Sequence, residues 1–175
     1  MQVFIVRGLV AIVWAAVFAT AADSLTLGTG ILVVLYPLID VVASLVDART
    51  QHGPARRTLL INAGTSTAAA VALAIAATGS VANVLAVVGV WALLAGAAQL
   101  VTALRRRAQY GSQWPMRLAG AGSVIFGVAF ILASMMSAPT LGMIAVYAAT
   151  GGLDFIIQAA LLARRRHHTA VAAAA

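Results

Sequence analysis

The 175-residue sequence contains no cysteine, no lysine and no glutamate, and only 9% of its residues are charged. The absence of cysteine excludes disulfides, thiolate metal sites and a cysteine nucleophile. The low charge excludes an ordinary soluble domain, in which about 25% of residues are charged. Hydrophobic residues instead make up 63% of the chain. The composition therefore predicts an integral membrane protein.

Long hydrophobic segments fill nearly all of the sequence. A helix of about 20 apolar residues crosses the ~30 Å hydrocarbon layer of a bilayer. The expected transmembrane helices cover residues 4–22, 27–46, 58–77, 81–104, 117–136 and 140–163. The sequence thus predicts an all-α membrane protein with six transmembrane helices, and the bilayer is its first expected partner.

All basic side chains flank these segments on one predicted side. With no lysine present, the basic residues are eleven arginines, and the net charge is +7. A cytoplasmic N-terminus places every arginine on the cytoplasmic side, as the positive-inside rule requires, and the opposite orientation translocates all of them. We expect a multi-pass protein of the bacterial inner (plasma) membrane with both termini cytoplasmic. Membrane topology explains the arginines, so no nucleic-acid partner is expected.

The first hydrophobic segment has a second interpretation as a signal peptide. A basic Arg7, a short apolar stretch and the small residues 19–22 resemble its three regions. The internal repeat described next argues against cleavage, because removing this segment leaves the second half of the first unit without its partner.

The arginines also mark an internal repeat of helical hairpins. They open the odd-numbered segments and close the even-numbered ones, at Arg7, Arg49, Arg57, Arg105, Arg117 and Arg164. The predicted repeats, about 4–49, 57–107 and 117–166, are parallel, since each begins and ends in the cytoplasm. They form a single transmembrane domain, 1–166, followed by a short, flexible, alanine-rich tail, 167–175.

Small residues recur at four-residue spacing on two segments, as at helix contacts in lipid. They are Asn62, Ser66, Ala70 and Ala74 on the third segment, and Ala119, Ser123 and Gly127 on the fifth. A packing seam within the chain and a homo-oligomer contact both fit this pattern.

Two aspartates lie inside predicted membrane helices, where acidic residues are rare and point to function. Asp40 and Asp154 precede the closing arginines by nine and ten residues, about 13–15 Å along a helix. With Asn62, Gln99 and Gln158 they form the candidate site for protons or cations. The alternative is a structural role, as neutral carboxyls or one ion pair hydrogen-bonded between helices.

The remaining polar residues carry weaker signals. Pro37 is expected to kink the helix that bears Asp40, and Asn62 is a candidate partner of either aspartate. His52, His167 and His168 do not form a metal site, and no cofactor is expected. The clusters Arg105–Arg107 and Arg164–Arg166 are candidates for binding anionic lipid.

The third unit resembles the HdeD-like acid-resistance membrane proteins. The resemblance rests on Trp114, on the glycine-rich Leu118–Ser123, on Pro139 in a short turn, and on the stretch Gly152–Ala160. It implies a six-helix inner-membrane protein linked to acid or envelope stress, and it implies no catalytic residues.

We therefore expect a non-enzymatic membrane protein that acts by assembly or by binding other membrane components. The alternative is a small proton, cation or solute transporter or channel that uses Asp40 and Asp154. An enzyme ranks third, because the polar residues include no nucleophile and base in a known arrangement.

Overall fold

The computed structural model describes residues 2–110 and 114–174, and this part of the chain is helical with no strand. The six helices are α1 (Gln2–Ala19), α2 (Leu27–Thr50), α3 (Gly53–Ala76), α4 (Val81–Tyr110), α5 (Trp114–Ser134) and α6 (Gly142–Ala174). The prediction of an all-α protein is confirmed.

Five of the helices, α2 to α6, are long and apolar enough to cross a membrane, and α1 is a shorter apolar helix. Their bounds lie close to the expected ones, with four clear extensions: α2 ends four residues later than expected, α3 begins five residues earlier, and α4 and α6 extend further still. α4 continues to Tyr110, and α6 continues to Ala174, past the expected end at residue 163. Alanine has the highest helix propensity, so the alanine-rich end favours continuation of α6 where the sequence suggested a flexible tail.

Local signals explain where the helices start. Thr26 caps α2: its hydroxyl accepts a bond from the Thr29 amide, and the Thr29 hydroxyl accepts one from the Thr26 amide. At the start of α3, Gly53 has a φ of 57°, a left-handed conformation that suits glycine. Pro54 follows in the first turn, where a missing N–H costs nothing.

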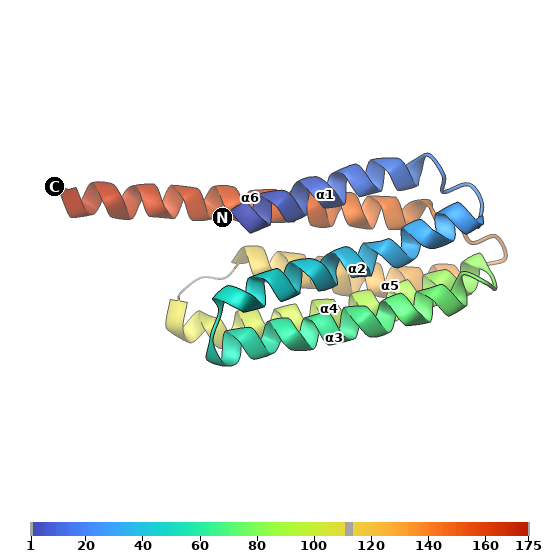
Figure 1. Ribbon diagram of the computed structural model, residues 1–175, viewed down its shortest axis with the longest axis horizontal. Helices are drawn as coiled ribbons and strands as arrows, with labels where there is room; N and C mark the ends of the chain where they lie inside the picture. Colours follow the sequence, from blue (N-terminus) through green and yellow to red (C-terminus); the bar gives the residue numbers. More distant parts are fainter. Residues whose placement is uncertain (1, 111–113, 175) are drawn as a thin grey trace.

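The helices run alternately up and down (Figure 1). The start of α1, the α2–α3 connection, the end of α4 and the start of α5 lie at one end of the bundle, and the α1–α2, α3–α4 and α5–α6 connections lie at the opposite end (Figure 1). We call the first the basic end, because the described arginines Arg7, Arg49, Arg56, Arg57 and Arg117 lie in the helix turns nearest to it.

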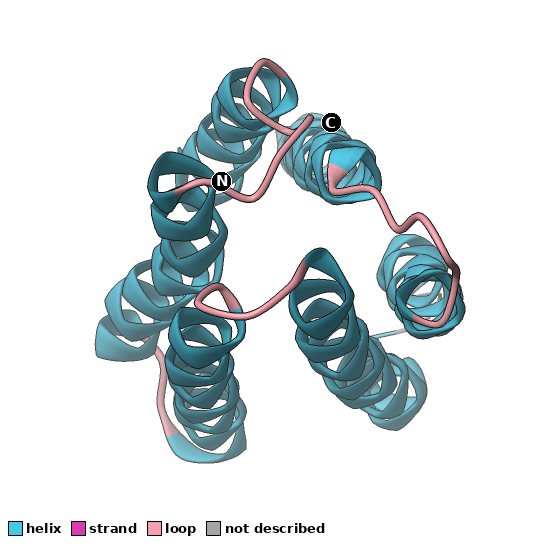
Figure 2. Cartoon of the chain, turned by 90° about the vertical axis from the view of Figure 1, so that its right-hand side faces the viewer, coloured by secondary structure: helices cyan, strands magenta, loops and turns pink. Residues whose placement is uncertain are grey.

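Seen along the bundle, the helices surround a common centre (Figure 2). Neighbours in this ring do not pack equally. The pairs α2–α3, α4–α5 and α6–α1 pack closely, whereas the pairs joined at the opposite end, α1–α2, α3–α4 and α5–α6, pack loosely. The predicted hairpins are therefore present in the connectivity, while the closest packing occurs between one hairpin and the next.

Glycines explain why two of these pairs are so close. A Cβ atom built on Gly8 of α1 lies 2.7 Å from the carbonyl oxygen of Gly152 on α6. A Cβ atom on Gly96 of α4 lies 2.7 Å from the carbonyl oxygen of Gly120 on α5. Real Cβ atoms do not approach so closely, so only glycine permits these backbone contacts, which dominate helix association in lipid.

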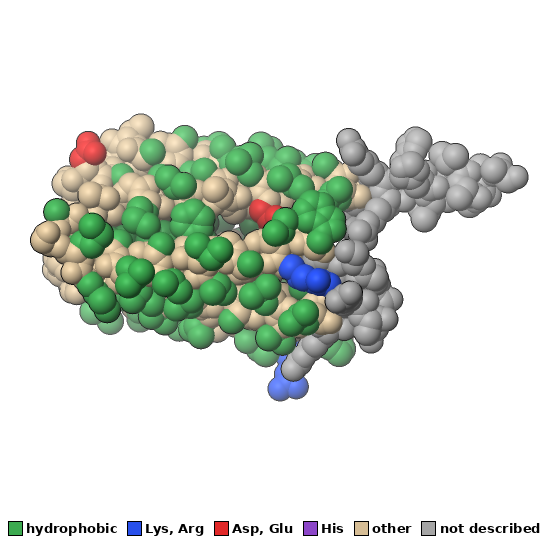
Figure 3. All heavy atoms as spheres, turned by 180° about the vertical axis from the view of Figure 1, so that it is seen from behind, with side chains coloured by type: hydrophobic (Ala, Val, Ile, Leu, Met, Phe, Trp, Pro, Cys, Tyr) green, Lys and Arg blue, Asp and Glu red, His purple; other side chains and the backbone are tan. Residues whose placement is uncertain are grey.

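Aromatic side chains fill the centre of the ring. Tyr36 of α2 stacks on Trp14 of α1 with ring centroids 4.5 Å apart, and Trp91 of α4 meets its edge at 5.5 Å. Tyr147 of α6 contacts Tyr36 on one side and Phe130 of α5 on the other, at 6.2 and 5.7 Å. Trp14, Trp91, Tyr147 and Phe130 are buried. On the face shown in Figure 3, by contrast, the exposed side chains are mostly hydrophobic, as expected for a protein surrounded by lipid.

Candidate functional site

An ion pair joins α1 to α2 in the half of the bundle nearer the basic end. The Arg7 guanidinium donates a hydrogen bond to Oδ1 of Asp40. The Arg7 and Asp40 side chains are only 15% and 23% exposed. Since a lone charge in the membrane costs about 3 kcal/mol on insertion scales, each group compensates for the other.

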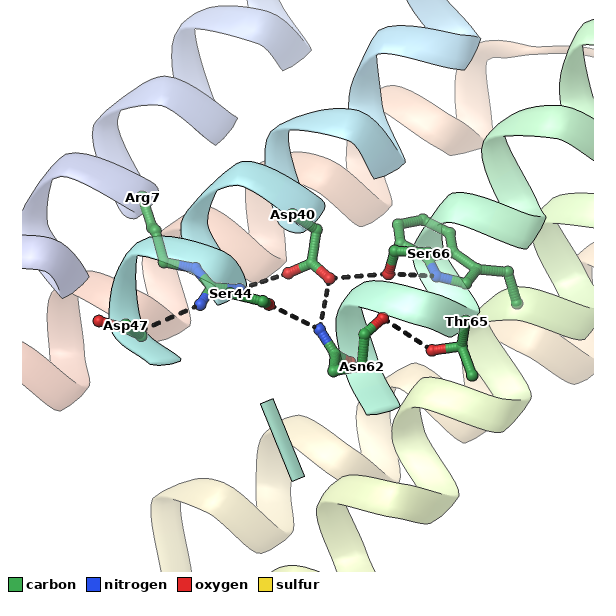
Figure 4. A network of polar contacts seen from close by, with 8 residues as sticks. Arg7, Asp40, Ser44, Asp47, Asn62, Thr65 and Ser66 are labelled. Carbon is green, nitrogen blue, oxygen red and sulfur yellow. Dashed lines mark hydrogen bonds and ion pairs between the residues drawn. The ribbon is translucent and has the colours of Figure 1, made fainter. Parts of the chain in front are cut away.

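The second oxygen of Asp40 binds α3. Asn62 Nδ2 donates to Oδ2 at 2.6 Å, and the Ser66 hydroxyl donates to the same atom at 2.8 Å. Asn62 also donates to the hydroxyl of Ser44, one turn further along α2, at 2.9 Å. Ser44 and Ser66 are fully buried. The Asp40 carboxylate is thus held by three donors from two neighbouring helices (Figure 4).

The network reaches the other side of the ring through two further contacts. The indole N–H of Trp91 on α4 donates to the Ser66 hydroxyl at 3.2 Å. The Arg7 guanidinium carbon lies 4.6 Å from the ring centre of Phe155 on α6, a cation–π contact. One charged cluster therefore connects α1, α2, α3, α4 and α6.

The cluster has an excess of negative charge. Asp47, two turns beyond Asp40 on α2, has its Oδ2 3.6 Å from Nη1 of Arg7. Arg7 contributes one positive charge and the two aspartates one negative charge each, so the sum is −1 when all three are ionised. This second ion pair is the outermost contact of the same cluster.

This arrangement can bind neighbouring helices to one another and fix their positions. The carboxylate of Asp40 accepts its hydrogen bonds from groups of the same chain, so its capacity to accept is largely used. Among the residues that the structure describes, no three His, Cys, Asp or Glu side chains gather where a metal ion could bind.

The structure places the five sequence-predicted site residues in three different surroundings. Asp40 and Asn62 bind each other, which is one of the two pairings that the sequence left open. Asp154 accepts a hydrogen bond from Gln158, four residues along the same helix. Gln99 lies on α4 and takes no part in either group of contacts among the described residues.

The two aspartates also differ in the helix face on which they lie. Asp40 precedes Ser44, at the close α2–α3 contact, by four residues, which is about 40° around the helix. Asp154 follows Gly152, at the close α6–α1 contact, by two residues, about 200° around the helix. Asp40 therefore faces the neighbouring helix, whereas Asp154 faces away from it. Their similar distance from the closing arginines does not make their surroundings equivalent.

Six members of the cluster were missed as site residues: Arg7, Ser44, Asp47, Ser66, Trp91 and Phe155. Arg7 was interpreted as a marker of topology and of the repeat, and as the basic residue of a signal peptide, although it lies inside the hydrophobic segment 4–22. That position was a usable signal, since a basic residue within a membrane helix requires a partner. For Trp91 the sequence carries no comparable signal. The arginines 105–107 and 164–166, candidates for lipid binding, have side chains that lie outside the described residues.

Part of the chain matches a known protein family. Residues 61–132 match a family described as a short repeat of unknown function, DUF308. The chain carries a DUF308 repeat. The HdeD-like proteins belong to this family, so the resemblance seen in the sequence is confirmed at the family level. No curated protein matches the chain. No solved structure matches it either.

The family match includes some residues of the charged cluster and leaves out others. It spans most of α3, the whole of α4 as far as the structure describes it, and α5 to Leu132. Asn62, Ser66 and Trp91 lie within it, whereas Arg7 and Asp40 lie outside. The charged pair is therefore a feature of this chain beyond the matched repeat.

Proposed function

We propose that this protein is a non-enzymatic, multi-pass protein of the bacterial inner membrane that supports resistance to acid or envelope stress. It acts through assembly or interaction within the membrane, with both termini in the cytoplasm. The match of residues 61–132 to the DUF308 family supports the assignment as a membrane protein of unknown function. The stress role rests on the likeness to HdeD-like proteins, and the orientation rests on the arginines.

One observation favours a structural role over transport: the polar groups of Asp40 are bound by groups of the same chain. A residue that carries a proton or a cation must exchange partners and contact water during its cycle. Asp40 instead binds Arg7, Asn62 and Ser66, and aromatic rings pack the adjacent centre of the bundle. In this proposal the cluster holds five helices in register and leaves the outer surface to contact other membrane components.

Acid survival of a deletion strain tests the stress role. We expect the deletion to lower survival at low pH and the unmodified gene to restore it. Asp154→Asn should restore it fully, because the partner of Asp154 among the described residues, Gln158, lies on its own helix. Asp40→Asn should restore it in proportion to the amount of folded protein. Normal survival of the deletion strain refutes the stress role.

Flux through liposomes tests the transporter alternative independently. Purified protein is reconstituted, and proton and potassium fluxes are followed with a pH-sensitive dye and a potassium electrode. We expect both fluxes to equal those of empty liposomes. A flux that Asp40→Asn and Asp154→Asn both abolish, with the variants folded, would establish transport and overturn the structural proposal.

A further inference from the structure

A groove runs between α1 and α2, the loosely packed pair that the ion pair holds together. Its volume is about 600 Å³. The lining is apolar except at Arg7 and consists of Val3, Val6, Arg7, Val10, Leu35, Leu38, Ile39, Val42, Ala43 and Val46. Several of these side chains, among them Val6, Val42 and Val46, are exposed on the outer surface of the bundle. In a membrane the groove therefore opens to lipid.

The length of the groove matches one leaflet. From Val46 to Leu35 it extends over eleven residues of α2, about 16 Å along the helix axis. Half of a ~30 Å hydrocarbon layer is about 15 Å. Since Val46 lies one turn before the end of α2 at the basic end, the groove covers the leaflet on that side. An acyl chain that enters from the headgroup region reaches its full depth.

The mouth of the groove is positively charged. Leu35, Val42 and Arg49 follow one another at seven-residue spacing, so Arg49 continues the α2 wall of the groove into the headgroup region. Arg49 is exposed, as are Arg56 and Arg57 at the nearby start of α3. Counting Arg7, Arg49, Arg56 and Arg57 against Asp40 and Asp47 gives four positive and two negative charges, a sum of +2. This charge favours an anionic headgroup.

We propose that the α1–α2 groove is a binding site for one anionic glycerophospholipid of the leaflet at the basic end. Its acyl chain lies along the valines and leucines of the groove, and its phosphate lies at Arg49. The site is formed by α1 and α2, and it does not depend on the proposed stress role.

Native mass spectrometry of the delipidated full-length protein tests the site. The protein is titrated in detergent with dioleoyl phosphatidylglycerol and, separately, with dioleoyl phosphatidylcholine. We expect one phosphatidylglycerol to bind more tightly than the rest, and more tightly than phosphatidylcholine. Val42→Trp fills the groove and should weaken this first binding at least tenfold. Val71→Trp is the matched control, because Val71 is a valine of α3 with 59% exposure against 62% for Val42.

A second pair of variants distinguishes the contribution of the lipid headgroup from that of the acyl chain. Arg49 is exposed, so changing it avoids a folding defect. Arg49→Gln should lower the preference for phosphatidylglycerol about fivefold, the value of one surface charge. Arg117→Gln, which changes an arginine at the basic end on α5, a helix that contacts neither α1 nor α2 in the described structure, should leave it within twofold. The proposal fails if Val42→Trp binds phosphatidylglycerol like the unmodified protein, if Val71→Trp weakens binding equally, or if Arg49→Gln keeps the full preference. A second protein copy seated in the groove would appear instead as a dimer that Val42→Trp dissociates.

Discussion

Removing the Asp40 carboxylate tests the central packing argument. In Asp40→Leu, the partners that Arg7 keeps in the described part of the chain are Asp47, at 3.6 Å, and the Phe155 ring. The amide of Asn62 and the hydroxyl of Ser66 lose their shared acceptor. The substitution thus leaves a partly compensated charge and two unsatisfied donors in the half of the bundle nearer the basic end.

The expected loss of stability follows from these lost contacts. Breaking a buried ion pair by removing one partner costs about 3–5 kcal/mol, and the remaining contact with Asp47 places this case near the lower limit, at about 3 kcal/mol. Removing both charges, in Arg7→Leu with Asp40→Leu, is expected to cost about 1 kcal/mol. An apolar pair of similar volume often replaces a buried ion pair without loss of stability.

Unfolding in mixed detergent micelles, titrated with dodecyl sulfate and followed by circular dichroism, measures these differences. Asp154→Leu is the matched control and should cost less than about 1 kcal/mol, because it loses one hydrogen bond within a helix. If Asp154→Leu destabilises as much as Asp40→Leu, or if the double variant is no more stable than the single one, the two aspartates do not differ as the structure indicates.

Two further predictions concern the close helix pairs and the orientation. Gly152→Val should cost about 2 kcal/mol in the same unfolding assay, because the Cβ atom of the valine would lie 2.8 Å from the Gly8 carbonyl oxygen. Gly64→Val is the control: a Cβ atom at Gly64 meets nothing within 4 Å, so this variant should change stability by less than about 0.5 kcal/mol. An equal loss in both variants would show that the α1–α6 contact is looser than described. Since the chain has no cysteine, single cysteines introduced by Thr78→Cys and Gln51→Cys report topology without background labelling. An impermeant maleimide should label Thr78→Cys in intact spheroplasts and Gln51→Cys only after permeabilisation. The reverse pattern would invert the proposed orientation.

The sequence was sufficient for the helices and their order. Five of the six segments are long and apolar enough to cross the bilayer, and hydropathy predicted the apolar part of each helix, although not the full extent of α4 and α6. These features are local, because every backbone polar group in lipid must be satisfied within its own helix. The candidate site was only partly predictable for the same reason: the membrane position of Asp40 is local information, whereas its partners are not.

The sequence by itself thus determined a helical membrane protein, the alternation of basic and neutral connections, and Asp40 as an acid inside the membrane. Only the tertiary structure decided which helices pack closely, and that Asp40 binds Arg7 across 33 residues of sequence while Asp154 binds its own helix. The physical reason is that hydropathy records how deep a residue lies in the bilayer, but not the direction in which its side chain points. Pairing depends on that direction, which is fixed by the rotation of each helix once glycines such as Gly8 and Gly152 meet.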